Sequence, residues 1–277
     1  MSSRTFVTLC AAALAMLAVR MGISQTTGPA TGPMTFPAPV PQTKAFADLA
    51  AKAARIGPIH AVGRWELAVP AREGRKARKD VFAFEVWAAP PRMKAWVDAP
   101  SRLTRVSDGK FVYTYAHEPG QAVEARRRAL SESNVYQAAG VGGPVLDAAK
   151  GYPSLARSAR FTPIEEPADC AKDFAGLKWF RLDPLTKPPH HLLVGTSKVI
   201  VGISPADGLM RVMVADLANK EQPPDISSVF FEKVEPRQIK PDEMMLPSEA
   251  ANTQWVDTDN NKEPIPAPTD LIAPKKP

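Results

Sequence analysis

Cysteine is scarce in this chain of 277 residues, which contains only Cys10 and Cys170. Cys10 lies in an apolar N-terminal stretch, where the leucine before it makes a poor site for lipid attachment. If that stretch is removed on export, Cys170 remains alone and no intramolecular disulfide can form. The folded state of the exported protein must then be stabilised by its hydrophobic core.

The sequence also lacks the motifs of common enzyme classes, because it contains no G-x-S-x-G, H-E-x-x-H or phosphate-loop pattern. His190 and His191 are adjacent, so on a strand they would point to opposite faces and make a poor chelating pair. A stretch that begins like a calcium loop at Asp257 fails at its sixth and twelfth positions, which are Lys262 and Pro268. We therefore predict no catalytic residues, no metal site and no cofactor, in a protein that is not an enzyme.

The apolar run over residues 5–19 is too short for a comfortable membrane span, which needs about 20 residues. It follows Arg4 and leads to a small-residue site that ends at Ser24. This order is typical of a secretion signal peptide, so we predict that residues 1–24 are a signal peptide and that the protein acts in the periplasm. An uncleaved N-terminal anchor is the alternative, because Arg20 interrupts the approach to the cleavage site.

The chain is basic, with a formal net charge of +6, and two stretches concentrate the positive charge. These are "RKARK" (75–79) and "RRR" (126–128), which fall where a hairpin turn and an exposed helix face are expected. An exported protein rarely meets nucleic acid, so we interpret both stretches as solvated surface charge and predict no nucleic-acid binding. A weaker interpretation is transient contact of the basic turn with an anionic membrane surface or a membrane protein.

Proline-rich stretches flank the central part of the chain. Residues 25–43 are rich in Pro, Thr and Gly and predict a flexible tether, and residues 258–277 predict a disordered tail, since neither can bury much apolar surface. Residues 44–257 remain as one folded domain, which we expect to be a monomer.

The pattern within this domain predicts a mainly β fold with some α-helix. Residues 44–57 carry apolar side chains at helical spacing. Short alternating stretches follow over 60–115 and again over 177–236, with tight turns where glycine follows Asp108 and Asp207. Two antiparallel meanders of this kind would supply nine to eleven strands, and such a wide sheet is expected to curl into an incomplete (unclosed) antiparallel β-barrel.

Residues 121–161 separate the two meanders and are alanine-rich with glycine breaks, which predicts two or three short helices placed as a lid. Just before them, Phe111, Tyr113 and Tyr115 are spaced two apart, so on one strand they share a face. The pattern alone leaves open whether these rings pack a solid core or line a cavity under the lid.

The block that begins at Pro91 resembles the outer-membrane lipoprotein carriers of the LolA/LolB superfamily. A proline opens a strand, Trp96 follows, Pro100 ends the strand, and "VSDGK" precedes the three aromatic residues. The later stretches "SPADGLMRVMVAD" and "VFFEKVEPRQIKPDEMMLPSE" are similar to an Asp-Gly hairpin and a closing strand of that family. One departure is Pro90, since carriers usually have at this position an arginine that helps to hold the lid closed.

The resemblance covers residues 44–257 and implies an N-terminal helix, an incomplete antiparallel barrel and a helical lid over an apolar cavity that takes up acyl chains. It implies a carrier of acylated lipoprotein or lipid cargo in outer-membrane biogenesis. The alternative is a periplasmic sensor or regulator of the same fold, RseB-like, that binds a signalling partner. On the carrier interpretation, the predicted ligand-binding residues are apolar side chains on the inner side of the sheet: Phe82, Phe84, Val86, Met93, Phe111, Tyr113, Tyr115, Leu192 and Val194.

We predict that the mature protein begins near Gln25 and is soluble in the periplasm, because signal peptidase cleaves after small residues such as Ser24. N-terminal sequencing of protein isolated from its own host checks this. Recovery of membrane-bound protein that still begins at Met1 would show that the segment is an anchor.

Overall fold

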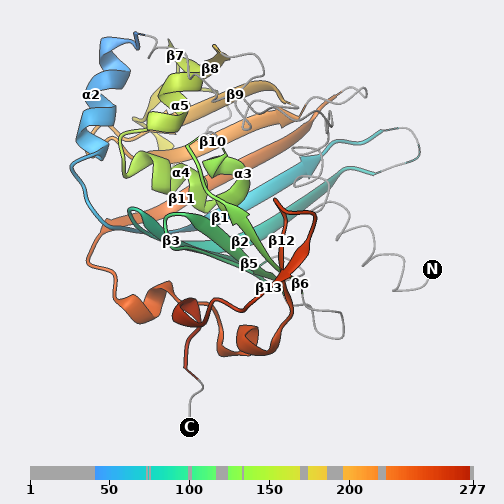
Figure 1. Ribbon diagram of the computed structural model, residues 1–277. Coiled ribbons are helices and arrows are strands. Elements are labelled where there is room, and N and C mark those ends of the chain that lie inside the picture. The colour runs from blue at the N-terminus through green and yellow to red at the C-terminus, as the bar shows by residue number, and fades with distance from the viewer. Residues whose placement is uncertain are drawn as a thin grey trace.

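The structure is a computed structural model, and its described residues form a curved, unclosed sheet with helices inside the curve (Figure 1). The described residues are 41–72, 74, 76–98, 102–116, 124–132, 134–168, 174–185, 196–217 and 223–274. The predicted signal peptide (1–24) and most of the predicted tether (25–43) lie outside them. No helix within the described part of the chain is long and apolar enough to span a bilayer.

The strands are β1 (Ile59–Val69), β2 (Arg78–Ala89), β3 (Arg92–Val97), β4 (Leu103–Ser107), β5 (Phe111–Ala116), β6 (Glu124–Ala129), β7 (Ala159–Ile164), β8 (Lys178–Pro184), β9 (Thr196–Ile203), β10 (Met210–Leu217), β11 (Asp225–Pro236), β12 (Trp255–Asp257) and β13 (Glu263–Ile265). The helices are α2 (Lys44–Ala53), α3 (Val135–Ala139), α4 (Gly142–Ala148) and α5 (Pro153–Ser158), and the 3-10 helices are η3 (Pro241–Met244), η4 (Ser248–Asn252) and η5 (Thr269–Leu271).

All of these strands belong to one 13-stranded sheet with the order β13-β12-β6-β5-β4-β3-β2-β1-β11-β10-β9-β8-β7. Neighbouring strands are antiparallel, except that β12 runs parallel to β6. The pairing of β1 with β11 has a register shift between Val62 and Gly63, and such irregularities bend a strand. The predicted fold class, an incomplete antiparallel barrel with an N-terminal helix and a helical insertion, is confirmed.

Helix α2 covers the inner side of the later strands. Thr43 caps its N-terminus, and the apolar spacing buries Phe46, as predicted for this helix. The Phe46 ring stacks on Phe161 of β7 with centroids 3.5 Å apart. Gly208, in the β9–β10 turn, has φ +74° and approaches the helix so closely that a β-carbon there would collide with the Leu49 carbonyl oxygen. The Asp-Gly turn therefore requires glycine for both conformation and space.

The chain between the meanders differs in part from the predicted helical lid. Residues 124–129 form strand β6, so the helix predicted over residues 121–134 is wrong there. These residues prefer a helix in isolation, but they form a strand because the free edge of β5 offers a ladder of backbone hydrogen bonds. The three short helices α3, α4 and α5 then follow, as predicted, and we call residues 134–158 the helical insertion.

The predicted disordered tail over residues 258–277 is wrong for residues 258–274. Strand β13 pairs with β12, and the backbone of Leu246 exchanges hydrogen bonds with Leu271 and Ala273 at 2.7 and 3.0 Å. The segment returns along the outer side of β4 to β6 (Figure 1). Its few apolar side chains suffice because they pack on a face that the sheet has already formed.

The aromatic strand faces outward, so the prediction that its rings line the concave side is wrong. Tyr113 and Tyr115 of β5 belong to an apolar cluster on the convex side, which we call the outer cluster. The Tyr113 ring meets Trp255 at 5.9 Å between centroids, and Phe111 meets Tyr113 at 6.4 Å. The three aromatic side chains do share one face of β5, but it is the outer face, which the C-terminal segment covers. The buried members of the cluster are Val106, Tyr115, Ala125, Leu246, Ala250 and Trp255.

Replacing Trp255 by alanine should lower the free energy of unfolding by about 3–5 kcal/mol, the usual range for a large buried aromatic. Trp255 is fully buried, and its indole N–H donates to the Ala250 carbonyl at 3.0 Å. Urea denaturation measures the change. Val81→Ala is the control, because Val81 is 53% exposed and its truncation should change stability by no more than about 0.5 kcal/mol. An unchanged midpoint in Trp255→Ala would show that the C-terminal segment adds nothing to the fold.

Candidate functional site

A row of apolar side chains crosses the concave face of five neighbouring strands. The register places Trp65 of β1 between Phe82 of β2 and Val229 of β11. The rings of Trp65 and Phe82 are 5.1 Å apart between centroids, and Trp65 Nε1 donates a 2.9 Å hydrogen bond to Ser227 Oγ. The row continues onto β10 and β9, and its members in order are Phe82, Trp65, Val229, Met213 and Val201.

A second group lies on the same face, toward the helices. Phe84 pairs with Gly63, and its ring uses the space that a side chain on Gly63 would need, since a β-carbon there would lie 2.7 Å from Phe84 Cζ. Phe84 meets Phe231 edge-on, with centroids 5.3 Å apart. Val86 and Met93 are fully buried beside them. We call this group together with the row above the apolar floor.

Helices α3 and α4 cover this part of the floor. A β-carbon at Gly142, at the start of α4, would lie only 2.8 Å from Met93 Sδ. A cavity of about 10 Å³ remains between α4 and the sheet, which is close to the minimum for one water molecule. Its lining residues are Ile59, Pro144, Val145, Ala148, Leu209, Met210, Phe231 and Val234. The covered part of the floor is therefore closed, and an acyl chain can reach it only if α3 and α4 move.

A buried carboxylate holds the helical insertion together. The Tyr136 hydroxyl of α3 donates to Asp147 Oδ2 at 3.0 Å, and the backbone N–H groups of Ser154 and Leu155 donate to its two oxygens at 2.9 and 3.2 Å. Burial raises the pKa of the Asp147 carboxyl from 3.8 to about 6, although these three donors favour the charged form. Asp147 therefore links all three helices.

Tyr152, between α4 and α5, anchors one side of the insertion to the later strands. It is fully buried, and its hydroxyl donates to the Gly208 carbonyl at 2.8 Å. Burial raises the pKa of this hydroxyl, so it remains a donor. The Gln42 side-chain amide donates to the carbonyls of Ala156 and Ala159 at 2.8 and 2.9 Å. The α5 side of the insertion is thus held by hydrogen bonds, whereas α3 and α4 rest on the floor through apolar contacts.

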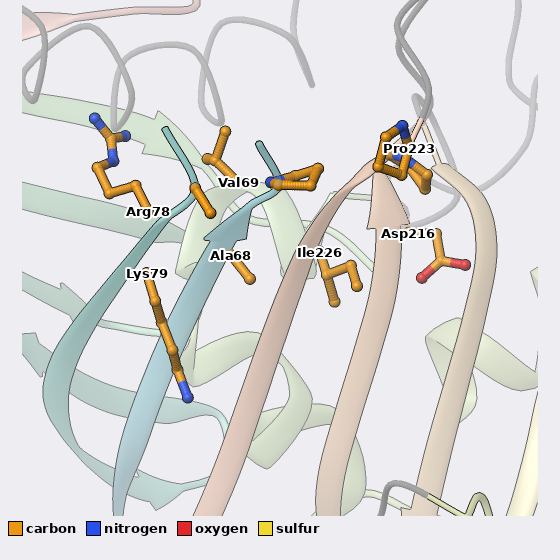
Figure 2. A pocket seen from close by; sticks show the side chains of 10 residues that line it. Ala68, Val69, Arg78, Lys79, Asp216, Pro223 and Ile226 are labelled. Atoms are coloured by element: carbon orange, nitrogen blue, oxygen red, sulfur yellow. The ribbon is translucent and has the colours of Figure 1, made fainter. Parts of the chain in front are cut away.

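A hollow of about 500 Å³ lies at the ends of β1, β2, β10 and β11 (Figure 2). On the convex face, the strand register aligns Lys79, Ala68, Ile226 and Asp216 across it. Arg78, Val69 and the proline pair that starts at Pro223 form other parts of its wall. The hollow lies at the end of the sheet and takes wall residues from both faces, and no sequence pattern indicated it.

A scan of the chain against models of known protein families finds no match, and a search of curated proteins finds none. Similar solved structures exist. A LolA superfamily protein from Nitrosomonas europaea is 10% identical, with a TM-score of 0.35, over 72% of this chain and 96% of that one. MucB is 12% identical, with a TM-score of 0.42, over 73% of this chain and 61% of that one. A DUF1329 family protein from Desulfovibrio piger is 8% identical, with a TM-score of 0.35, over 71% of this chain and 93% of that one.

The architecture of this chain is an incomplete antiparallel barrel with an N-terminal helix and a helical insertion. At these identities and TM-scores the comparisons say nothing about ligand or partner. The function of this chain has to be argued from its own residues.

The predicted ligand-binding residues fall into three groups. Phe82, Phe84, Val86 and Met93 lie together on the concave face as expected, and their role in binding stays a prediction. Phe111, Tyr113 and Tyr115 face the other way. Leu192 and Val194 lie outside the described residues.

Sequence reasoning missed the residues that complete the floor, which are Trp65, Val201, Met213, Val229 and Phe231. For Trp65 a signal existed, because Ile59, Ala61, Gly63, Trp65 and Leu67 alternate along β1 and share one face. Met213 and Phe231 come from strands after the insertion. Their place beside Trp65 depends on β1 pairing with β11, and no local pattern reports that pairing.

The free energy of unfolding should fall as pH rises from about 4 to about 7, by up to about 3 kcal/mol from Asp147 alone. The folded state raises the pKa of Asp147 to about 6, so it binds this proton more tightly than the unfolded chain does. The resulting stabilisation is complete below about pH 4 and is lost as pH passes 6.

Urea denaturation of the protein and of Asp147→Asn over this pH range isolates the effect as the difference between their unfolding free energies. Asp48→Asn, on the exposed side of α2, controls for the loss of one negative charge. A difference between the protein and Asp147→Asn that stays constant with pH would contradict the assignment.

Proposed function

We propose that the protein is an exported periplasmic carrier that shelters the acyl chains of a lipid or lipoprotein on its apolar floor. The observation that carries this proposal is that the apolar surface is longer than its helical cover. Phe82, Met213 and Leu217 pack against the core and yet are only partly buried. A partly exposed apolar strip inside a curved sheet suits a chain-like apolar ligand.

Uptake requires α3 and α4 to leave the floor, and an acyl chain can replace their contacts because these are mainly apolar. Each methylene kept from water is worth about 0.8 kcal/mol. A chain in a bilayer is already out of water, so its transfer to the floor changes the free energy little and can run in both directions. Release then needs an acceptor that holds the chain somewhat better, and no covalent step is involved.

The anchoring of the insertion limits which part can move. Tyr152 and α5 are tied to Gly208 and Gln42 by hydrogen bonds. Gly140 and Gly151, on either side of α4, have φ of +58° and +81°. Glycine allows the backbone to change direction at such positions at low cost. We therefore assign the opening movement to α3 and α4, with α5 remaining in place. This movement has to break the hydrogen bonds that Ser154 and Leu155 of α5 donate to Asp147 of α4.

A periplasmic sensor that binds a signalling partner is the second candidate, and the hollow at the strand ends favours it. Ile226 in its wall is 38% exposed, and Val81, on the same face of the sheet, is 53% exposed; they are the exposed large apolar side chains of the described residues. An apolar surface of a partner could bury both. Native mass spectrometry of protein purified from its periplasm separates the two candidates: a bound acylated species favours the carrier, and an empty, protein-associated form favours the sensor.

Replacing Leu146 of α4 by alanine should tighten the binding of a fluorescent fatty acid methyl ester by at least about tenfold. Leu146 belongs to the main core, and truncating a buried leucine costs about 2–5 kcal/mol. Every 1.4 kcal/mol taken from the closed state favours the open, binding-competent state tenfold. Fluorescence titration measures the affinity, and amide exchange over residues 135–148 should speed up when the ester binds.

Leu246→Ala is the matched control, because Leu246 is equally buried but lies in the outer cluster. It should lower stability to a similar extent and leave the affinity unchanged. An equal gain in ester affinity in both variants would mean that uptake depends on the overall stability of the protein and not on the release of α3 and α4 from the floor. Failure of the unmodified protein to bind either the ester or the corresponding free fatty acid would contradict the carrier function.

A further inference from the structure

Three arginines gather on the concave face where it is formed by β4, β5 and β6. The register aligns Arg105 of β4 with Thr114 of β5, and Thr114 with Arg126 of β6. Arg128 lies two residues further along β6 and so faces the same side. This face continues into the apolar floor, because Arg105 is paired on its other side with Ala95 of β3, which is buried under α4.

Arg105 has no carboxylate partner among the described residues. Its guanidinium lies against the turn between α3 and α4, where a β-carbon on Gly140 would collide with Nη1. Its Nε is buried and makes no hydrogen bond. Burial, together with the nearby charges of Arg126 and Arg128, lowers the pKa of Arg105 to about 10, against a smaller opposing effect of Glu124. Arg105 is partly buried, and a cation withdrawn from water among like charges is costly unless an anion joins it.

The nearby acids sit at the rim of this group. Glu124 Oε1 is 3.2 Å from Arg126 Nη1, and Asp259 Oδ1 is 3.8 Å from Arg128 Nε. Both carboxylates are well exposed, with 60% and 42% of the side chain accessible. Two exposed acids against three arginines leave an excess of positive charge, and it is concentrated at Arg105, next to the helices that cover the floor.

Apolar side chains connect the arginines to the floor. Ala116, Leu130 and Val141 are partly buried and pack against the main core from β5, from the residue after β6 and from the α3–α4 turn. A ligand chain on the floor would therefore pass beside the arginines when α3 and α4 open. The concave face thus combines a long apolar surface with a cationic end, which is the complement of an anionic amphiphile.

We propose that Arg105, Arg126 and Arg128 bind the anionic head, a phosphate or a carboxylate, of an amphiphile whose acyl chain lies on the apolar floor. This inference rests on the proposed carrier function and adds the class of its cargo. Guanidinium groups present paired N–H donors that match the oxygens of phosphate and carboxylate. The anion supplies Nε of Arg105 with the acceptor that it lacks and relieves the repulsion among the three cations.

The test compares a fluorescent fatty acid with its methyl ester at about pH 8, where the free carboxylate is ionised. The two probes share one chain and differ in the charge of the head. The protein should bind the acid at least about tenfold more tightly than the ester, the scale of hydrogen bonds to charged groups. The preference should shrink with added salt, while ester binding should not change.

Arg105→Gln should remove most of this preference and leave the affinity for the ester unchanged. The second variant combines Arg126→Gln with Arg128→Gln. The side chains of Arg126 and Arg128 are partly exposed on β6, so this variant should fold and keeps the test valid even if Arg105→Gln does not. Arg92→Gln is the matched control, since Arg92 is an exposed arginine of β3 and its loss should affect neither probe.

Equal affinity of the unmodified protein for acid and ester, or a preference that persists in both arginine variants, would overturn the anion site and leave the carrier function standing. Binding of neither probe would instead contradict the carrier function, and the cargo class with it. Inorganic phosphate distinguishes a lipid head from a free anion. Phosphate alone should therefore fail to displace the acid completely at the concentration expected for a simple anion site. Complete displacement, with no affinity added by the acyl chain of the probe, would show that the site binds a simple anion and not an amphiphile.

Discussion

The antiparallel pairing of β1 with both β2 and β11 is the interaction on which the rest of the structure depends. It joins the strands that precede the helical insertion to those that follow it. Without it the two meanders would be separate sheets, each with an apolar face open to water. Gly63 of β1 is central to this junction, because its missing side chain admits the Phe230 carbonyl of β11 on one side and the Phe84 ring of β2 on the other.

An unclosed sheet leaves two faces to cover, and this chain covers them in different ways. The outer face is held by the C-terminal segment through backbone hydrogen bonds, the buried Trp255 and the 2.5 Å ion pair of Arg127 with Asp257. On the inner face, α2 covers the later strands, and α3 and α4 rest on the apolar floor mainly through apolar contacts. A fixed outer cover and a removable inner one are what the proposed carrier function requires, because only the inner surface would exchange protein contacts for ligand contacts.

The arginines of β6 show how alternation along a strand divides the charge between these faces. Arg127 points outward, and its pKa is raised because it donates a hydrogen bond to Asp257. Arg126 and Arg128 point inward, where they join Arg105. One basic stretch, interpreted from the sequence as an exposed helix face, thus supplies both a structural ion pair and the cationic part of the concavity.

Local pattern was enough to determine the α2 helix, most strands, the Asp-Gly turns and the curled antiparallel sheet, because helical spacing, alternation and turn chemistry act over a few residues. It also determined that Phe111, Tyr113 and Tyr115 share a face. Which face they occupy was decided only by tertiary structure, since Trp255 and Leu246 come from far along the chain to cover them. The same holds for strand β6, which exists because β5 offers it an edge, and for the floor, where Trp65 meets Val229 and Met213 through pairings between distant strands. Sequence alone fixes which side chains lie on the same side of a strand, but the burial of each side depends on long-range partners whose pairing leaves no trace in the local pattern.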